Sequence, residues 1–178
     1  MPLPLHGLIQ SLDDRRCALL DELATLSTEA LSARSQPDKW SILEVVEHMV
    51  LAERVILQGL PSRTDLVERP RSLKNRGAYV LVWLILRAGI PVKVPSKRML
   101  PTGKLSLVEL RQAWDEHLRW LRSFEQGQGA AARQQAVFMH PVAGPITLIQ
   151  ALRMDQLHLQ THIRQISKIR TQQASQNA

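Results

Sequence analysis

Hydrophobic residues recur every three or four positions in four long stretches of the chain, which is the spacing of an amphipathic helix. The first stretch covers residues 5–31, and one stripe of it carries Leu8, Leu12, Leu19, Leu23 and Leu26. The second runs from Ser41 to about Leu60, before Pro61, with an apolar face made of Ile42, Val45, Val46 and Met49. Both stretches predict helices.

The third helix is predicted to begin at Ser106 and the fourth at Thr147. Their apolar stripes alternate steps of three and four, as in a coiled-coil seam. These stripes are Leu107, Leu110, Trp114, His117, Leu121 and Phe124 in the third, and Leu148, Leu152, Asp155, Leu159, His162, Ile166 and Ile169 in the fourth. Ser41, Ser106 and Thr147 are each followed three residues later by Glu or Gln, which predicts a capping box at each start. The chain is therefore predicted to be all-α, and four such helices satisfy the packing rules of a four-helix bundle.

A long connection separates the second and third helices. Its apolar run at residues 77–90 predicts an extra short helix, too short to cross a bilayer comfortably and interrupted by Arg87. We expect this helix to be buried or covered by a partner, for which a homodimer is one arrangement. Its basic flanks also leave membrane-surface binding open as a weaker alternative. Residues 1–170 are predicted to form one domain, and 171–178 a frayed polar tail.

The net charge of +7 is concentrated in one part of the chain. Residues 61–104 hold ten Lys/Arg and only two acidic residues, Asp65 and Glu68, so the remainder is close to neutral. The chain has neither a recognisable helix-turn-helix nor interleaved aromatic and basic residues, so we do not expect nucleic-acid binding. The single Cys17 excludes an internal disulfide, and no leader pattern opens the sequence, so a cytoplasmic location is expected.

Two histidines lie four residues apart in the fourth helix, so His158 and His162 share one face. Asp155 lies on the same stripe, and burying this much polarity is costly unless the groups are satisfied together. His48, near the middle of the second helix, supplies a third imidazole from a facing helix. Three imidazoles and a water would leave an open position on a divalent metal, as in catalytic zinc sites. We predict no site for an organic cofactor.

Two segments carry a resemblance to a known family. "KWSILEVVEHM" in the second helix and "HLQTHIRQI" in the fourth resemble the DinB-like superfamily of four-helix-bundle proteins. That superfamily includes YfiT-type metal-dependent hydrolases and transferases that use low-molecular-weight thiols. The resemblance implies that His48, His158 and His162 bind a divalent metal, zinc or nickel, for hydrolysis or thiol transfer. It also implies a small-molecule substrate, and the basic segment favours an anionic one.

Three further residues are candidates for catalysis. Asp155 is expected either to accept a hydrogen bond from a ligand imidazole or to pair with an arginine. His140, beside Pro141, is interpreted as a proton donor or substrate contact, or else as a residue of a surface turn. Glu44 is a candidate acid or base, although its role as a helix cap already explains it. The alternative function is a non-catalytic bundle that acts as a protein-interaction or stress-related binding module.

Overall fold

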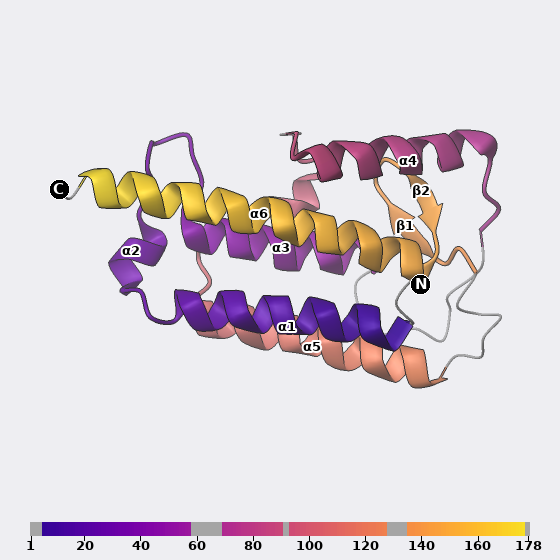
Figure 1. Cartoon of the computed structure of the whole chain (residues 1–178), viewed down its shortest axis with the longest axis horizontal. Coiled ribbons are helices and arrows are strands. Elements are labelled where there is room, and N and C mark those ends of the chain that lie inside the picture. The colour runs from indigo at the N-terminus through magenta and orange to yellow at the C-terminus, as the bar shows by residue number, and fades with distance from the viewer. Residues whose placement is uncertain (1–4, 58–68, 91–92, 128–134, 177–178) are drawn as a thin grey trace.

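The computed structural model describes residues 5–57, 69–90, 93–127 and 135–176. Four long helices run side by side in it: α1 (Leu5–Leu23), α3 (Ile42–Ile56), α5 (Leu107–Gly127) and α6 (Leu148–Gln176). Both α1 and α3 pack against α5 and α6, so the four helices enclose one core (Figure 1). The predicted all-α four-helix bundle is confirmed.

The core is formed by the apolar stripes that the sequence spacing defines. Buried side chains of these stripes include Leu8 and Leu23 of α1, Ile42 of α3, Leu110 of α5 and Leu152 of α6. Each comes from a helix that presents one apolar face inward. The starts of α5 and α6 are also as predicted, since Ser106 with Glu109, and Thr147 with Gln150, exchange the reciprocal bonds of a capping box.

The prediction of one helix over residues 5–31 is wrong, because the first helix ends at Leu23. A second, short helix follows, α2 (Thr28–Ser32), with Ser27 as its N-cap. The Thr25 hydroxyl donates to the Glu22 carbonyl, and the Ser27 side chain accepts from the Ala30 amide. Side chains of this kind compete with the helical hydrogen-bond ladder and favour a turn.

The ends of two other helices also differ from the prediction. The second helix was expected to reach Leu60; α3 ends at Ile56, and Leu60 lies outside the described residues. Residues from Thr171 were expected to fray, whereas α6 remains helical to Gln176. The Gln173 side-chain amide donates to the Ala30 and Ala33 carbonyls. These bonds hold the last part of α6 against the α2 region. The extent of the single domain stays a prediction.

A small hairpin that the sequence pattern did not predict leads into α6. Strands β1 (Phe138–His140) and β2 (Gly144–Ile146) are antiparallel, with Phe138 opposite Ile146. Both of these side chains are fully buried, and Gly144 has φ +72°, a conformation that favours glycine. The hairpin contacts α3, α4 and α6, so it fixes His140 at one end of the bundle.

The extra helix of the long connection is α4 (Leu73–Ala88), which lies outside the bundle against α6 (Figure 1). Ser72 and Asn75 form its capping box, and Gly89 ends it in the left-handed conformation. None of its residues is buried, so the interpretation of a buried helix is wrong. Covering by a partner stays a prediction. Among the described residues, no helix is long and apolar enough to cross a membrane.

Candidate metal centre

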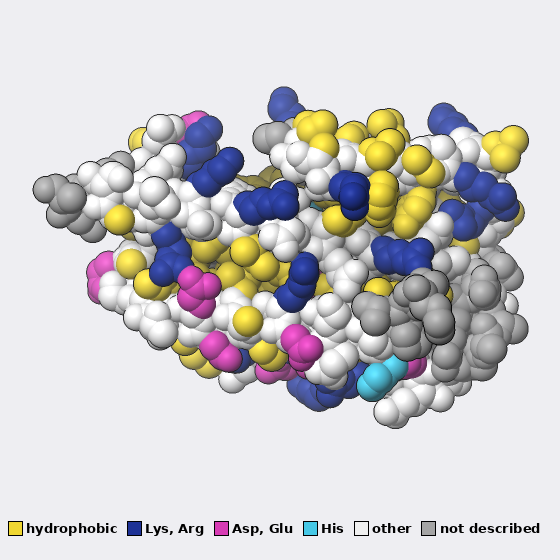
Figure 2. Space-filling model, in the orientation of Figure 1, with side chains coloured by type: hydrophobic (Ala, Val, Ile, Leu, Met, Phe, Trp, Pro, Cys, Tyr) yellow, Lys and Arg dark blue, Asp and Glu magenta, His cyan; other side chains and the backbone are white. Residues whose placement is uncertain are grey.

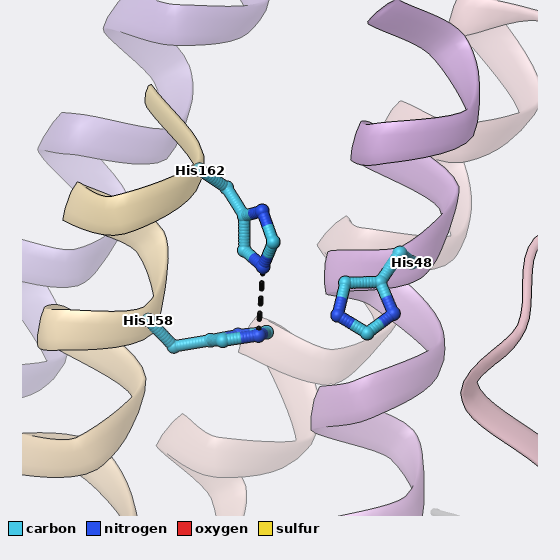
Figure 3. A group of neighbouring side chains, drawn as sticks. All are labelled: His48, His158 and His162. Atoms are coloured by element: carbon cyan, nitrogen blue, oxygen red, sulfur yellow. Dashed lines mark hydrogen bonds between the residues drawn. The ribbon is translucent and has the colours of Figure 1, made fainter. Parts of the chain in front are cut away.

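Three imidazoles converge between two facing helices. His48 comes from the middle of α3, and His158 and His162 come from successive turns of α6 (Figure 3). One nitrogen of each ring lies within 4.8 Å of the corresponding nitrogens of the other two. The ring centroids are 5.3 Å apart for His48 and His158 and 4.4 Å apart for His158 and His162. The three predicted ligands are therefore brought to one place.

The orientation of His48 is fixed by the connection between α4 and α5. Its Nδ1 lies 2.7 Å from the Met99 carbonyl oxygen, in the 3-10 helix η1 (Lys97–Met99). A carbonyl oxygen only accepts, so Nδ1 carries the ring proton and Nε2 keeps its lone pair. The Trp40 ring, 5.0 Å from the His48 ring, packs on this imidazole.

The same connection is tied to α3 one residue before His48. The buried Glu47 carboxylate accepts from the Thr102 hydroxyl and from the Gly103 amide, both at 2.8 Å. Sequence reasoning missed Met99, because no side-chain pattern marks a backbone carbonyl. The available signal was Glu47 next to His48 on an inward-facing helix, because a buried carboxylate needs hydrogen-bond donors from another segment.

The orientation of His162 is fixed within its own helix. Its Nδ1 lies 2.8 Å from the Gln165 side-chain oxygen, so this nitrogen donates and Nε2 presents a lone pair. That Nε2 lies 3.0 Å from Nε2 of His158 (Figure 3). Gln165 was missed as an acceptor, although its spacing of three residues from His162 could have revealed it.

Burial keeps the three imidazoles neutral. It lowers the pKa of His48, although the bond to Met99 acts in the opposite direction. Burial, followed by the neighbouring histidines, lowers the pKa of His158 well below its usual value. Burial and then His48 lower the pKa of His162 to about 4. Neutral imidazole is the form that binds metals, so the cluster is ready to bind one at neutral pH.

The donor set fits a divalent cation. Two imidazole nitrogens on one zinc-type ion lie about 2.9–3.4 Å apart, given metal–nitrogen distances of about 2.0–2.1 Å. The distance of 3.0 Å between the His158 and His162 nitrogens falls in that range. His48 and His162 both present an Nε2 lone pair to the same space. Two lone pairs cannot form a hydrogen bond with each other, whereas a cation could accept both.

Asp155 belongs to a different cluster, between the same helices of the bundle. It lines a cavity of about 20 Å³ together with Arg16, Glu53 and Trp114. Glu53 accepts from the Trp114 indole at 2.7 Å. Burial and then the Glu53 charge raise the pKa of Asp155 well above its usual value, while Arg16 acts in the opposite direction. Arg16 forms its ion pairs with other aspartates, Asp13 and Asp115.

His117 of α5 also belongs to this cluster. It is almost fully buried, and its Nδ1 lies 3.3 Å from a Glu53 oxygen. Among the described residues, no hydrogen bond joins Asp155 to a ligand imidazole. The role predicted for Asp155 as the acceptor for a ligand is carried instead by Met99 and Gln165.

His140 ends β1, and its ring orientation is fixed by its own turn. Its Nδ1 accepts from the backbone amides of Val142 and Ala143 at 3.1 and 3.0 Å, so the ring proton lies on Nε2. Burial lowers the pKa of His140 to about 4. His140 is also close enough to His158 to lower the pKa of that residue.

Glu44 is held by contacts at the start of α3. Its carboxylate accepts from the Ser41 amide at 2.8 Å and from the Arg34 Nε at 2.9 Å, and it forms an ion pair with the same guanidinium. Burial alone would raise the pKa of Glu44, but the bonds from Arg34 and Ser41 together hold it below its usual value. These contacts match the capping role.

The fold and the cluster define a class of protein, a four-helix bundle with a three-histidine cluster between facing helices that is compatible with a divalent metal. The family model of the DinB superfamily matches residues 11–166, and the chain belongs to that superfamily. Neither a curated protein nor a solved structure matches the chain. The family and the three-histidine cluster together fit a metal-dependent enzyme.

Proposed function

We propose that this protein is an enzyme that uses a divalent metal, zinc or nickel, to activate water or a thiol for hydrolysis or thiol transfer. The observation that carries the proposal is the convergence of three neutral imidazoles from α3 and α6. His48, His158 and His162 would hold the ion, and three protein ligands leave a coordination position for a small molecule. The bound ion would supply Lewis acidity and lower the pKa of the water or thiol.

The remaining roles belong to residues of this chain. Met99 and Gln165 orient the ligand imidazoles through their Nδ1 protons. His140, with its proton on Nε2, acts as a hydrogen-bond donor toward the substrate from the hairpin. Because its pKa is about 4, His140 is neutral at neutral pH and donates without becoming an imidazolium.

An anionic substrate or an acidic low-molecular-weight thiol suits the surroundings of the centre. Lys97 and Arg98 are exposed on η1, directly before Met99, whose carbonyl orients His48. Their charges favour an anion at this part of the molecule. No acidic residue occurs between positions 69 and 104 to offset them.

Metal content tests the first part of the proposal. We expect untagged wild-type protein to carry about one divalent ion per chain, and His158→Ala to lose it. His6→Ala is the matched control, because His6 lies on α1 with a side chain 74% exposed. Equal metal content in wild type and His158→Ala would refute the metal centre.

Turnover tests the second part. The metal-loaded protein should act on members of a panel of hydrolase and thiol-transfer substrates, whereas His158→Ala and chelated wild type should not. His140→Gln should keep the metal and lose activity, because glutamine cannot donate from the same fixed position. Metal retained without turnover on any substrate would refute the enzyme proposal and favour a non-catalytic binding module.

A further inference from the structure

The outer face of α4 is apolar and exposed. Leu73 is 84% exposed, Val80 52%, Leu81 57% and Leu84 50%. Figure 2 shows hydrophobic side chains gathered over this helix. Single exposed apolar residues are common on protein surfaces, but a continuous group on one helix marks an interaction site.

These residues form one stripe along the helix axis. At 100° per residue, Leu73, Gly77, Val80, Leu81, Leu84 and Ala88 fall within an arc of about 100°. The opposite face of α4 carries Tyr79, Val82 and Leu86, which pack against the core. The helix is therefore apolar on two faces, and the described part of the chain covers only one of them.

Basic residues border the stripe on both sides. Lys74 lies just beyond one edge of the arc, and Arg76 and Arg87 lie beyond the other. The Arg87 guanidinium lies 5.3 Å from the Trp83 ring centre, so an aromatic ring also borders the stripe. Figure 2 shows several dark blue side chains around the hydrophobic group, and no magenta side chain is visible over α4. A partner for this face must be apolar at its centre and negatively charged around it.

We infer that the outer face of α4 binds the surface of a bilayer that contains anionic phospholipids. The helix lies in the plane of the interface, with its apolar stripe among the acyl chains and its basic borders at the headgroups. Helices that lie on membranes in this way combine an apolar arc with Lys and Arg at its borders and an aromatic ring at headgroup level. This inference is independent of the metal centre.

Charge argues against a second copy of the chain as the occupant. A symmetric dimer through this stripe would bring the basic borders of the two helices together. Residues 69–104 hold nine Lys/Arg and no acidic residue, so nothing on this segment would neutralise them. An anionic lipid surface provides the missing negative charge and accepts the apolar side chains at the same time.

Co-sedimentation with vesicles tests the inference. Wild-type protein is mixed with vesicles of phosphatidylcholine alone, or of three parts phosphatidylcholine to one part phosphatidylglycerol. We expect binding to the anionic vesicles and little binding to the neutral ones. High salt should weaken the binding, because part of it is electrostatic.

Two double variants separate the two contributions. Val80→Ser with Leu84→Ser should lower the partition coefficient about ten-fold or more, through lost apolar burial. Lys74→Gln with Arg76→Gln should lower it about twenty-five-fold, at about five-fold for each basic residue. The matched controls are Val108→Ser and Arg119→Gln, exposed residues of α5, which lies across the bundle from α4. Unchanged circular dichroism and metal content show that each variant is folded.

Several results would overturn the inference. One is wild-type protein that stays in the supernatant with anionic vesicles. Another is a loss of binding in the α5 controls as large as in the α4 variants. A third is a dimer in light scattering that Val80→Ser with Leu84→Ser converts to a monomer, without vesicle binding by wild type; the stripe would then be a dimer interface.

Discussion

The three imidazoles of the proposed metal centre have their orientations fixed in three ways. His48 donates to a backbone carbonyl, His162 donates to a side-chain amide, and His158 is held in contact with His162. Only the amide of Gln165 can be removed by a single substitution that leaves the backbone unchanged. The affinity of the centre for metal should therefore depend measurably on that residue.

We predict that Gln165→Leu weakens metal binding about 10-fold to 100-fold, because the His162 ring loses the acceptor that fixes its tautomer. Competition with a chromogenic chelator measures the change. Gln160→Leu is the control, since Gln160 is on the same helix and accepts a bond only from Arg15 in the described structure. An unchanged affinity in Gln165→Leu would contradict this account of the site.

A second prediction concerns Glu44 and acid. The folded state holds the pKa of Glu44 below its usual value, so its stabilising effect is complete above the pKa of the unfolded chain, about 4.3. The effect is lost as the pH falls through the lower pKa of the folded state. Glu44→Gln should lower the free energy of unfolding by about 1 kcal/mol at neutral pH, with a smaller difference in acid.

Urea unfolding of both proteins over a pH series measures this difference. The control is Glu116→Gln, an exposed residue on α5. A difference between wild type and Glu44→Gln that stays constant down to strongly acidic pH would show that the carboxylate charge contributes nothing to the cap.

At this scale the sequence predicts which histidines come together better than it predicts the groups that orient them. His48, His158 and His162 could be found because helical spacing brings them to inward faces, and family motifs mark them. Met99 acts through its backbone, which carries no mark in the sequence. Asp155 was predicted to face the interior and does line a cavity between the helices, but spacing along one helix cannot tell which partner a neighbouring helix supplies.

At the scale of elements, the connection between α4 and α5 belongs to the proposed metal centre. It returns to α3 through the two bonds of Glu47 and thereby holds the Met99 carbonyl against His48. Charge alone indicated only a basic segment in this region. The contact between Met99 and His48 gives the segment a second role, which is to orient the His48 imidazole.

We predict that Glu47→Ala affects the stability of the protein and its metal binding together. The Thr102 hydroxyl and the Gly103 amide would lose their acceptor, at a cost of about 1–3 kcal/mol. Release of the connection would also free the His48 ring, so the affinity for metal should fall. Thermal unfolding and chelator competition measure the two effects. The control is Glu116→Ala, an exposed residue on α5, and a stability loss with unchanged affinity would contradict the coupling.

Local signals predicted where helices begin more reliably than where they break. Ser41, Ser106 and Thr147 mark real starts because their capping bonds are formed within a few residues. The break after Leu23 depends on weak side-chain bonds of Thr25 and Ser27, which the leucine stripe obscures. The strands β1 and β2 have three residues each, too short to show an alternating pattern.

At the scale of the whole molecule, the interior of the bundle contains a second polar cluster beside the metal centre. Every long helix contributes to it, with Arg16 from α1, Glu53 from α3, His117 from α5 and Asp155 from α6. The apolar stripes predicted that His117 and Asp155 face inward. That they meet Arg16 and Glu53 follows only from how the four helices pack.

The charge of Asp155 should destabilise the fold at neutral pH. Burial and the Glu53 charge raise the pKa of Asp155 in the folded state, so folding favours the protonated form. Between the unfolded and folded pKa values the folded state binds more protons, and stability therefore falls as the pH rises through that range. Asp155→Asn removes the charge and keeps the shape. We predict that it increases the free energy of unfolding by about 1–2 kcal/mol at neutral pH.

The gain from Asp155→Asn should shrink as the pH is lowered toward the usual carboxyl range, because wild-type Asp155 is then protonated in both states. Urea unfolding of the two proteins over a pH series measures it, and Asp38→Asn, on an exposed side chain, is the control. A loss of stability in Asp155→Asn at neutral pH would mean that Arg16 outweighs Glu53 and burial. The carboxylate would then stabilise the bundle, and it would be the arginine partner that one of the two sequence-based interpretations expected.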